Sequence, residues 1–180
     1  MPTTFIALLR AINVSGVNTL PTKDFVALLE GLGFRKIKTY IQTGNAVFEA
    51  NDKDCSKLAG KIKAAINRDF GFTPEALLFT SDEFEKAIKA NPYPEAESDP
   101  KSLHLIFLAA APKSPDLAVI EKLLKDSERF TLKGRVFYFH APEGVGRSKA
   151  FSKIEKALGL PGTARNFRTV RTLADMAREG

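Results

Sequence analysis

The stretch IKTYIQTGNAVFEA, residues 37–50, decides the fold because it contains a complete β-hairpin. Ile37 to Gln42 and Ala46 to Ala50 are short runs rich in β-branched and aromatic residues, and such runs favour strands. Thr43, Gly44 and Asn45 separate the runs, and hairpin turns prefer glycine and asparagine. The stretch therefore predicts two adjacent antiparallel strands.

The segments around this hairpin predict a βαββαβ order. Residues 5–9 form an apolar run, which indicates a buried strand. Residues 22–33 have apolar positions at helical spacing, with Thr22 as the expected N-cap and Gly33 as the stop. Residues 58–66 predict a second helix and residues 76–79 a further strand. This order is that of the ferredoxin-like fold.

The second half of the chain repeats the pattern. We expect a strand at 103–109, a helix opened by Ser114 and Pro115, a hairpin over 129–140 and a helix from about Ser148. A helix opened by Ser81 and a Pro-rich linker at 91–100 separate the halves, and an amphipathic helix from Thr163 ends the chain. Chance could produce this order twice, but we favour a duplication of architecture.

The fold class expected is therefore α+β, with two ferredoxin-like units in tandem, exchanged elements and a C-terminal helix. We place the first unit at residues 1–80 and the second at 81–180, and we expect the two to pack as one compact body.

The composition excludes several classes of protein. Cys55 is the single cysteine among 180 residues, so no internal disulfide or cysteine-based metal cluster can form. The N-terminus lacks the basic head and apolar run of a signal peptide, and the apolar stretch 105–112 is too short to span a bilayer. We therefore expect a cytoplasmic protein with no membrane contact, no metal and no cofactor.

Positive charge gathers toward the C-terminus. The chain has a formal net charge of +6, and from Arg147 onward eight basic residues stand against three acidic ones. An excess of this kind favours anionic partners such as nucleic acid or a phosphorylated small molecule, although solubility alone also explains it.

Three loops carry the candidate ligand-binding residues. The loop after the first strand and the hairpin beside it are rich in Asn, Gln and Gly, the segment 142–149 is a glycine-rich connection, and 163–169 combines Arg, Asn and Thr. Glycine-rich turns and planar guanidinium groups both bind anions. Turn chemistry, helix capping or a solvated helix face would explain the same residues without a ligand. The candidates are Arg10, Asn13, Gln42, Asn45, Arg147, Ser148, Lys149, Arg165, Asn166 and Arg168.

No catalytic motif is present, so the sequence identifies no catalytic residue. His104 and His140 are far from Cys55 in the chain, and neither a Walker A loop nor a Gly-x-Ser-x-Gly elbow occurs. The stretch KGRVFYF at 133–139 matches the RNA-recognition signature poorly, and Phe137 and Phe139 share the strand face that a core requires.

Four motifs together resemble a bacterial family called domain of unknown function 1697. They are ALLRAINVSG at 7–16, Gly33-Phe34, TYIQTGNAVF at 39–48 and TARNFRTV at 163–170. Mild departures from the family pattern occur at Ala11, Ser15, Thr43 and Phe167. The resemblance implies two ferredoxin-like units with exchanged elements, and it implies no activity, ligand or catalytic residue. Its motifs coincide with the candidate loops, where functional residues concentrate.

Three functions fit the sequence. The first is a binding module for a phosphorylated or otherwise anionic partner, either nucleic acid or a nucleotide. The second is an enzyme for a small anionic substrate, positioned by Arg10, Gln42, Asn45 and Arg165. The third is a protein-interaction or scaffold role in which the loops are structural. We favour the first, and it depends on the candidate loops converging on one positively charged pocket. The sequence sets neither the oligomeric state nor the ligand.

Overall fold

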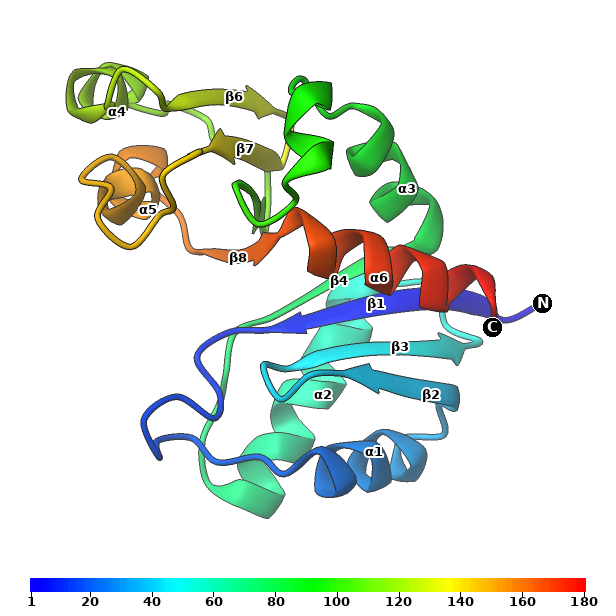
Figure 1. Ribbon diagram of the computed structural model, residues 1–180. Helices are drawn as coiled ribbons and strands as arrows, with labels where there is room; N and C mark the ends of the chain where they lie inside the picture. The colour runs from blue at the N-terminus through cyan, green and yellow to red at the C-terminus, as the bar shows by residue number, and fades with distance from the viewer. The chain divides into compact units, whose positions relative to one another are not determined.

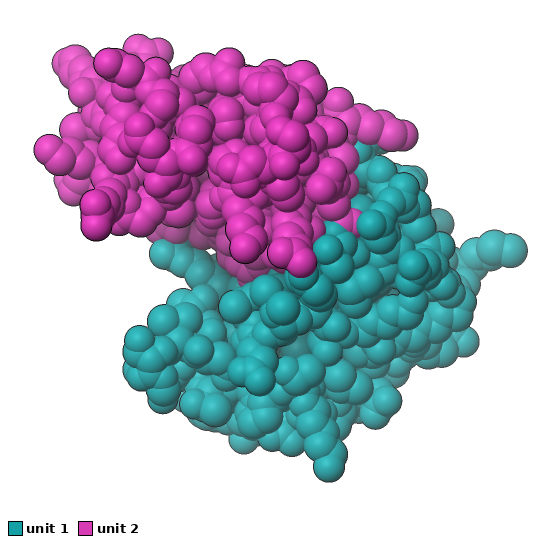
Figure 2. All heavy atoms as spheres, viewed as in Figure 1, with its two compact units in different colours: residues 1–86, 172–180 teal, residues 87–171 magenta.

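The computed structural model describes all 180 residues, and the chain divides into two compact units (Figure 2). Unit 1 comprises residues 1–86 and 172–180, and unit 2 comprises residues 87–171. Each unit contains one four-stranded antiparallel sheet.

The sheet of unit 1 has the strand order β2-β3-β1-β4 (Figure 1). Its strands are β1 (Thr3–Leu9), β2 (Arg35–Tyr40), β3 (Asn45–Ala50) and β4 (Ala76–Thr80), and its helices are α1 (Thr22–Gly31) and α2 (Cys55–Phe70). Phe5 pairs with Phe48, and both belong to a core that includes Phe25 of α1 and Ile62 of α2. Both helices therefore pack on the same face of the sheet.

Unit 2 repeats this topology with the strand order β6-β7-β5-β8. Its elements are β5 (Leu103–Leu108), α4 (Leu117–Leu123), β6 (Arg129–Lys133), β7 (Val136–His140), η2 (Phe151–Lys153), α5 (Ile154–Leu158) and β8 (Gly162–Asn166). Ile106, Phe137 and Phe139 form a core with α4 and α5. Two ferredoxin-like units in tandem are thereby confirmed, as is the core role of Phe137 and Phe139.

Three segments complete the chain. Helix α3 (Ser81–Lys89) follows β4, the 3₁₀ helix η1 (Pro94–Ser98) precedes β5, and α6 (Phe167–Arg178) follows β8. The C-terminal end of α6 lies in unit 1, where Arg178 forms an ion pair with Glu85 at 3.4 Å. None of the helices combines the length and the hydrophobicity that a membrane crossing requires.

The predicted helix start at Thr163 is wrong. Residues 162–166 form β8, which pairs with β5 in the register Leu105↔Arg165, and the helix begins only at Phe167. Asn166, not Thr163, caps the helix, because its Oδ1 accepts a hydrogen bond of 2.9 Å from the N–H of Thr169. Strand β8 supplies hydrogen-bond partners for β5, and the local sequence of residues 162–166 does not predict that pairing.

Other helix ends also differ from the predictions. The helix expected from Ser148 starts as η2 at Phe151. Helix α1 has Pro21 at its N-cap and no side-chain cap from Thr22. Before α3, Thr80 rather than Ser81 forms the cap: the N–H of Thr80 donates to Glu83 Oε2 at 2.8 Å, and the N–H of Glu83 donates to Thr80 Oγ1 at 3.2 Å.

The expected linker at 91–100 is ordered within unit 2. It contains η1, and Tyr93 and Ala96 are only 6% and 2% exposed. Proline and acidic residues predicted an open segment, but the two buried side chains anchor it.

Candidate functional site

The candidate residues of unit 1 lie where β1 ends and β3 begins. The N–H of Leu9 donates to the carbonyl of Gly44 at 2.8 Å, so the loop after β1 runs beside the hairpin turn. Asn13 Nδ2 donates to the carbonyls of Leu20 and Gln42 at 2.9 and 2.8 Å, and Asn13 Oδ1 accepts from the N–H of Leu20 at 2.7 Å. The structure brings these predicted residues together through Asn13, whose amide is fully used by the backbone.

Asn45 plays a similar internal role in the hairpin. It is 1% exposed, and its Nδ2 donates to the carbonyl of Tyr40 at 3.0 Å and to Thr43 Oγ1 at 2.9 Å. Arg10 is half-buried at the end of β1, and Gln42 is exposed. The cavity between the two loops has a volume of only about 10 Å³, room for about one water molecule. These loops hold one another, and a larger ligand would have to bind outside them.

The loop after β1 has an unusual backbone. Ala11, Asn13, Ser15 and Asn18 have φ between 51° and 56°, and Ile41 in the neighbouring turn has φ 49°. This left-handed region is costly for residues with a side chain, and most of all for a β-branched one. The hydrogen bonds of Asn13 and Asn45 help to hold this conformation, which explains why Asn and Gly recur in both loops.

In unit 2, the glycine-rich connection 142–149 presents two exposed cations. Arg147 and Lys149 are exposed, whereas Ser148 is 5% exposed and its Oγ accepts a hydrogen bond of 3.1 Å from the N–H of Phe151. The buried Ser148 hydroxyl therefore satisfies the first N–H of η2, while the cations on either side of it remain exposed.

Arg165 lies on the face of the unit 2 sheet that is opposite α4 and α5. It pairs in register with Leu105, whereas Ile106 and Leu108 face α4 and α5. The Arg165 guanidinium donates to Thr163 Oγ1 at 2.7 Å and to the carbonyl of Ala164 at 3.0 Å, and burial lowers its pKa to about 10. The structure thus separates Arg165 from the segment 147–149, while Arg168 is exposed on α6.

A groove between α4 and α5 continues the basic segment. Its volume is about 300 Å³, and it is lined by Asp116, Val119, Leu123, Lys153, Lys156 and Ala157. Figure 1 shows α4 and α5 side by side. Lys153 ends η2 and Lys156 lies in α5, and both line the groove, whereas Arg147 and Lys149 lie in the connection that precedes η2. We call Arg147, Lys149, Lys153 and Lys156 the basic rim.

The basic rim consists of exposed cations that form no ion pairs. All four side chains are exposed, and none of them forms an ion pair. By contrast, Lys125 in the same unit pairs with Glu143 at 3.3 Å. A row of unpaired cations beside a groove is suited to bind an anion.

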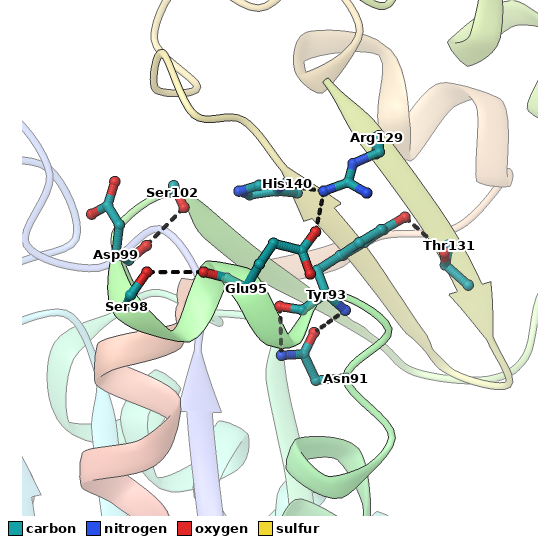
Figure 3. Close-up of polar contacts among 9 residues, drawn as sticks. All are labelled: Asn91, Tyr93, Glu95, Ser98, Asp99, Ser102, Arg129, Thr131 and His140. Carbon is teal, nitrogen blue, oxygen red and sulfur yellow. Dashed lines mark hydrogen bonds and ion pairs between the residues drawn. The ribbon is translucent and has the colours of Figure 1, made fainter. Parts of the chain in front are cut away.

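A second polar cluster joins residues 91–102 to β6 and β7 (Figure 3). Arg129 forms an ion pair with Glu95 and lies 3.3 Å from Nδ1 of His140, and its guanidinium is 4.9 Å from the centre of the Tyr93 ring. The Tyr93 hydroxyl is 2.7 Å from Thr131 Oγ1. These groups bind one another, so the cluster fixes the segment 91–102 on the sheet.

Burial and the charge of Arg129 shift the pKa values of His140 and Tyr93 in this cluster. Burial, and then the charge of Arg129, lower the pKa of His140, which keeps the imidazole neutral near neutral pH. Burial raises the pKa of the Tyr93 hydroxyl. A neutral imidazole can accept a hydrogen bond from Arg129 at Nδ1, which is the arrangement observed. No three His, Cys, Asp or Glu side chains gather in a way that could hold a metal ion.

Comparisons with known proteins assign the chain to a family. A family model described as "Protein of unknown function (DUF1697)" matches residues 2–138. The chain belongs to this family. Among solved structures, "The structure of conserved bacterial protein SP0830 from Streptococcus pneumoniae" is similar with a TM-score of 0.73 and 23% identity, covering 98% of this chain and 99% of that one. A search of curated proteins found no match.

The DUF1697 match confirms the resemblance carried by the hairpin and loop motifs, and the similar structure shows a shared fold. The residues matched by the family model end at 138, before the basic rim. The motifs at 7–16, 33–34 and 39–48 lie in unit 1 and the motif at 163–170 lies in unit 2, whereas Lys153 and Lys156 belong to no motif and only their charge and spacing indicate a site.

Proposed function

We propose that this DUF1697 protein is a binding module for an anionic partner, either a phosphorylated small molecule or nucleic acid. The basic rim of unit 2 makes the contact. The observation that supports this proposal is that four exposed cations, Arg147, Lys149, Lys153 and Lys156, occur within ten residues and none is paired with a carboxylate. The proposal places the protein in the cytoplasm, where such partners occur.

Arg and Lys contribute differently to such a contact. Arg147 offers a planar fork that can bind two phosphate oxygens, and the lysines act as point charges along the rim. Because all four are exposed, their individual contributions are small, and their joint effect depends on the ionic strength. The binding expected is therefore weak, sensitive to salt and indifferent to base sequence.

The experiment is a salt titration of binding to mixed-sequence single-stranded DNA and RNA and to a nucleoside triphosphate. If all four cations contact phosphate, the logarithm of the affinity for single strands falls with the logarithm of salt with a slope of roughly −3. The double variant K153Q/K156Q is expected to reduce this slope by roughly 1.4.

The matched control is K53Q/K61Q, which removes the same charge from two exposed, unpaired lysines of unit 1. This variant should keep the slope of the unaltered protein. Absence of binding to every probe in dilute buffer, or equal losses in the two double variants, refutes the proposal.

A further inference from the structure

The lining of the α4–α5 groove combines two kinds of surface. Val119 and Leu123 of α4 and Ala157 of α5 provide apolar atoms, and Lys153 of η2 and Lys156 of α5 provide charge. Val119 is 40% exposed, so its side chain is accessible to a ligand from solvent. The groove therefore offers both an apolar floor and a cationic edge.

The size of the groove matches a small organic molecule. Ligand sites in proteins typically have volumes of roughly 300 to 1,000 Å³ and are lined mostly by apolar atoms with a few polar groups that fix orientation. At about 300 Å³, the groove lies at the lower end of that range. It can hold a single ring or a short acyl chain.

The charges of the lining further restrict the ligand. Lys153 and Lys156 stand against one acidic residue, Asp116, so the lining carries an excess of one positive charge. A ligand with one anionic group is balanced by this lining, whereas a polyphosphate would bring several charges close to Asp116. Inorganic phosphate, which has no apolar part, would leave the apolar floor of the groove exposed to water.

We infer that the α4–α5 groove binds a small amphipathic anion, with an apolar ring or acyl chain on Val119, Leu123 and Ala157 and a carboxylate or phosphate monoester at Lys153 and Lys156. This inference rests on the proposed function and names the class of ligand for the same site. Burial of the apolar part supplies affinity, and the two lysines fix its orientation.

The experiment is a series of NMR titrations of the ¹⁵N-labelled protein with four probes. Benzoate and phenyl phosphate carry a ring and an anion, benzyl alcohol carries the ring alone, and inorganic phosphate carries the anion alone. We expect saturable shifts at the amides of Val119, Leu123 and Ala157 with the first two probes, and binding at least fivefold weaker with the other two. Comparing benzoate with phenyl phosphate distinguishes the two anionic groups.

Two variants test the two surfaces separately. K153Q/K156Q should weaken the binding of phenyl phosphate roughly fivefold to tenfold and leave the affinity for benzyl alcohol unchanged. Val119→Glu, at an exposed helical position, should abolish binding of benzoate and phenyl phosphate. Dispersed NMR spectra of both variants establish that they fold.

The outcomes separate this inference from the proposed function. If single-stranded DNA shifts the amides of the basic rim while no aromatic anion binds the groove, the inference is wrong and the proposed function stands. Equal affinity for phenyl phosphate and benzyl alcohol also overturns the inference, because the lysines then play no part. If neither DNA nor any anion binds, both are wrong.

Discussion

Replacement of Gly44 by alanine tests how the hairpin and the loop after β1 are held together. Gly44 has φ +80°, and a Cβ atom there would lie 2.6 Å from Cβ of Leu9 and 2.9 Å from Cδ1 of Ile12. Leu9 and Ile12 are 1% and 3% exposed, so neither can move away easily. The variant therefore suffers both a strained backbone and a steric clash.

The size of the effect can be worked out from these two causes. A left-handed backbone costs an L-residue about 1 to 2 kcal/mol, and overpacking of a dense core costs about 1 to 3 kcal/mol. Gly44→Ala should thus lower the free energy of unfolding by about 2 to 5 kcal/mol. Gly71→Ala is the matched control, because Gly71 has φ +78° and nothing lies within 4 Å of its added Cβ. It should lose only about 1 to 2 kcal/mol.

The assay is urea denaturation of the full chain followed by far-ultraviolet circular dichroism. Both glycines lie in unit 1, so both variants report on the same part of the chain. The quantity to compare is the difference between the two variants, which isolates the contact with Leu9 and Ile12. Equal losses of stability in the two variants would show that the close approach at Gly44 contributes nothing and would refute the reasoning.

Three further predictions concern stability. Gly162→Ala places a Cβ 2.6 Å from a β5 side chain and should lower the free energy of unfolding by about 1 to 3 kcal/mol in denaturation experiments. Gly146→Ala is the control, because open space surrounds its added Cβ, and it should lower that free energy by almost nothing. Similar losses in the two variants would contradict this prediction. Thr80→Ala removes the reciprocal cap with Glu83 and should lower the free energy of unfolding by about 1 kcal/mol. E83Q should lower it less, because the glutamine oxygen can still accept the hydrogen bond from the N–H of Thr80. The reverse order of the two losses would count against the cap. Burial lowers the pKa of His104 to about 4, so the unfolded chain takes up a proton near pH 6.5 that the folded chain refuses, and stability falls as pH drops from 7 toward 4. This residue alone should remove about 2 kcal/mol between pH 7 and pH 5, and His104→Leu should be less sensitive to acid by that amount; an unchanged pH profile would refute the assignment.

The fold followed from local patterns because each pattern has a local cause. The turn at 43–45 joins two strands, and the second half of the chain repeats the same order of apolar runs and turns. Periodicity reflects which side chains face the core, and it is present in the sequence before any tertiary contact forms. Boundaries were less accurate, as the strand end at Tyr40 instead of Gln42 shows.

The roles of the candidate residues depended on more distant partners. Asn13 was identified from composition, but its bonds to Leu20 and Gln42 join segments far apart in the chain. Tyr93 and Glu95 looked like members of an open linker until β6 and β7 supplied partners for them. Nothing near these residues in the sequence states which strand they will meet.

By itself, the sequence determined the βαββαβ order of the first unit, the βαββα order that opens the second, the family and the basic character of residues 147–156, because composition, apolar spacing and turn residues are local properties. Only the tertiary structure decided that residues 162–166 form a strand, that Arg165 lies away from Arg147, and that Lys153 and Lys156 border an apolar groove. The physical reason is that strand pairing and helix packing depend on complementary hydrogen bonds and shapes between segments that are far apart in the chain. The sequence of one segment does not specify which other segment will contact it.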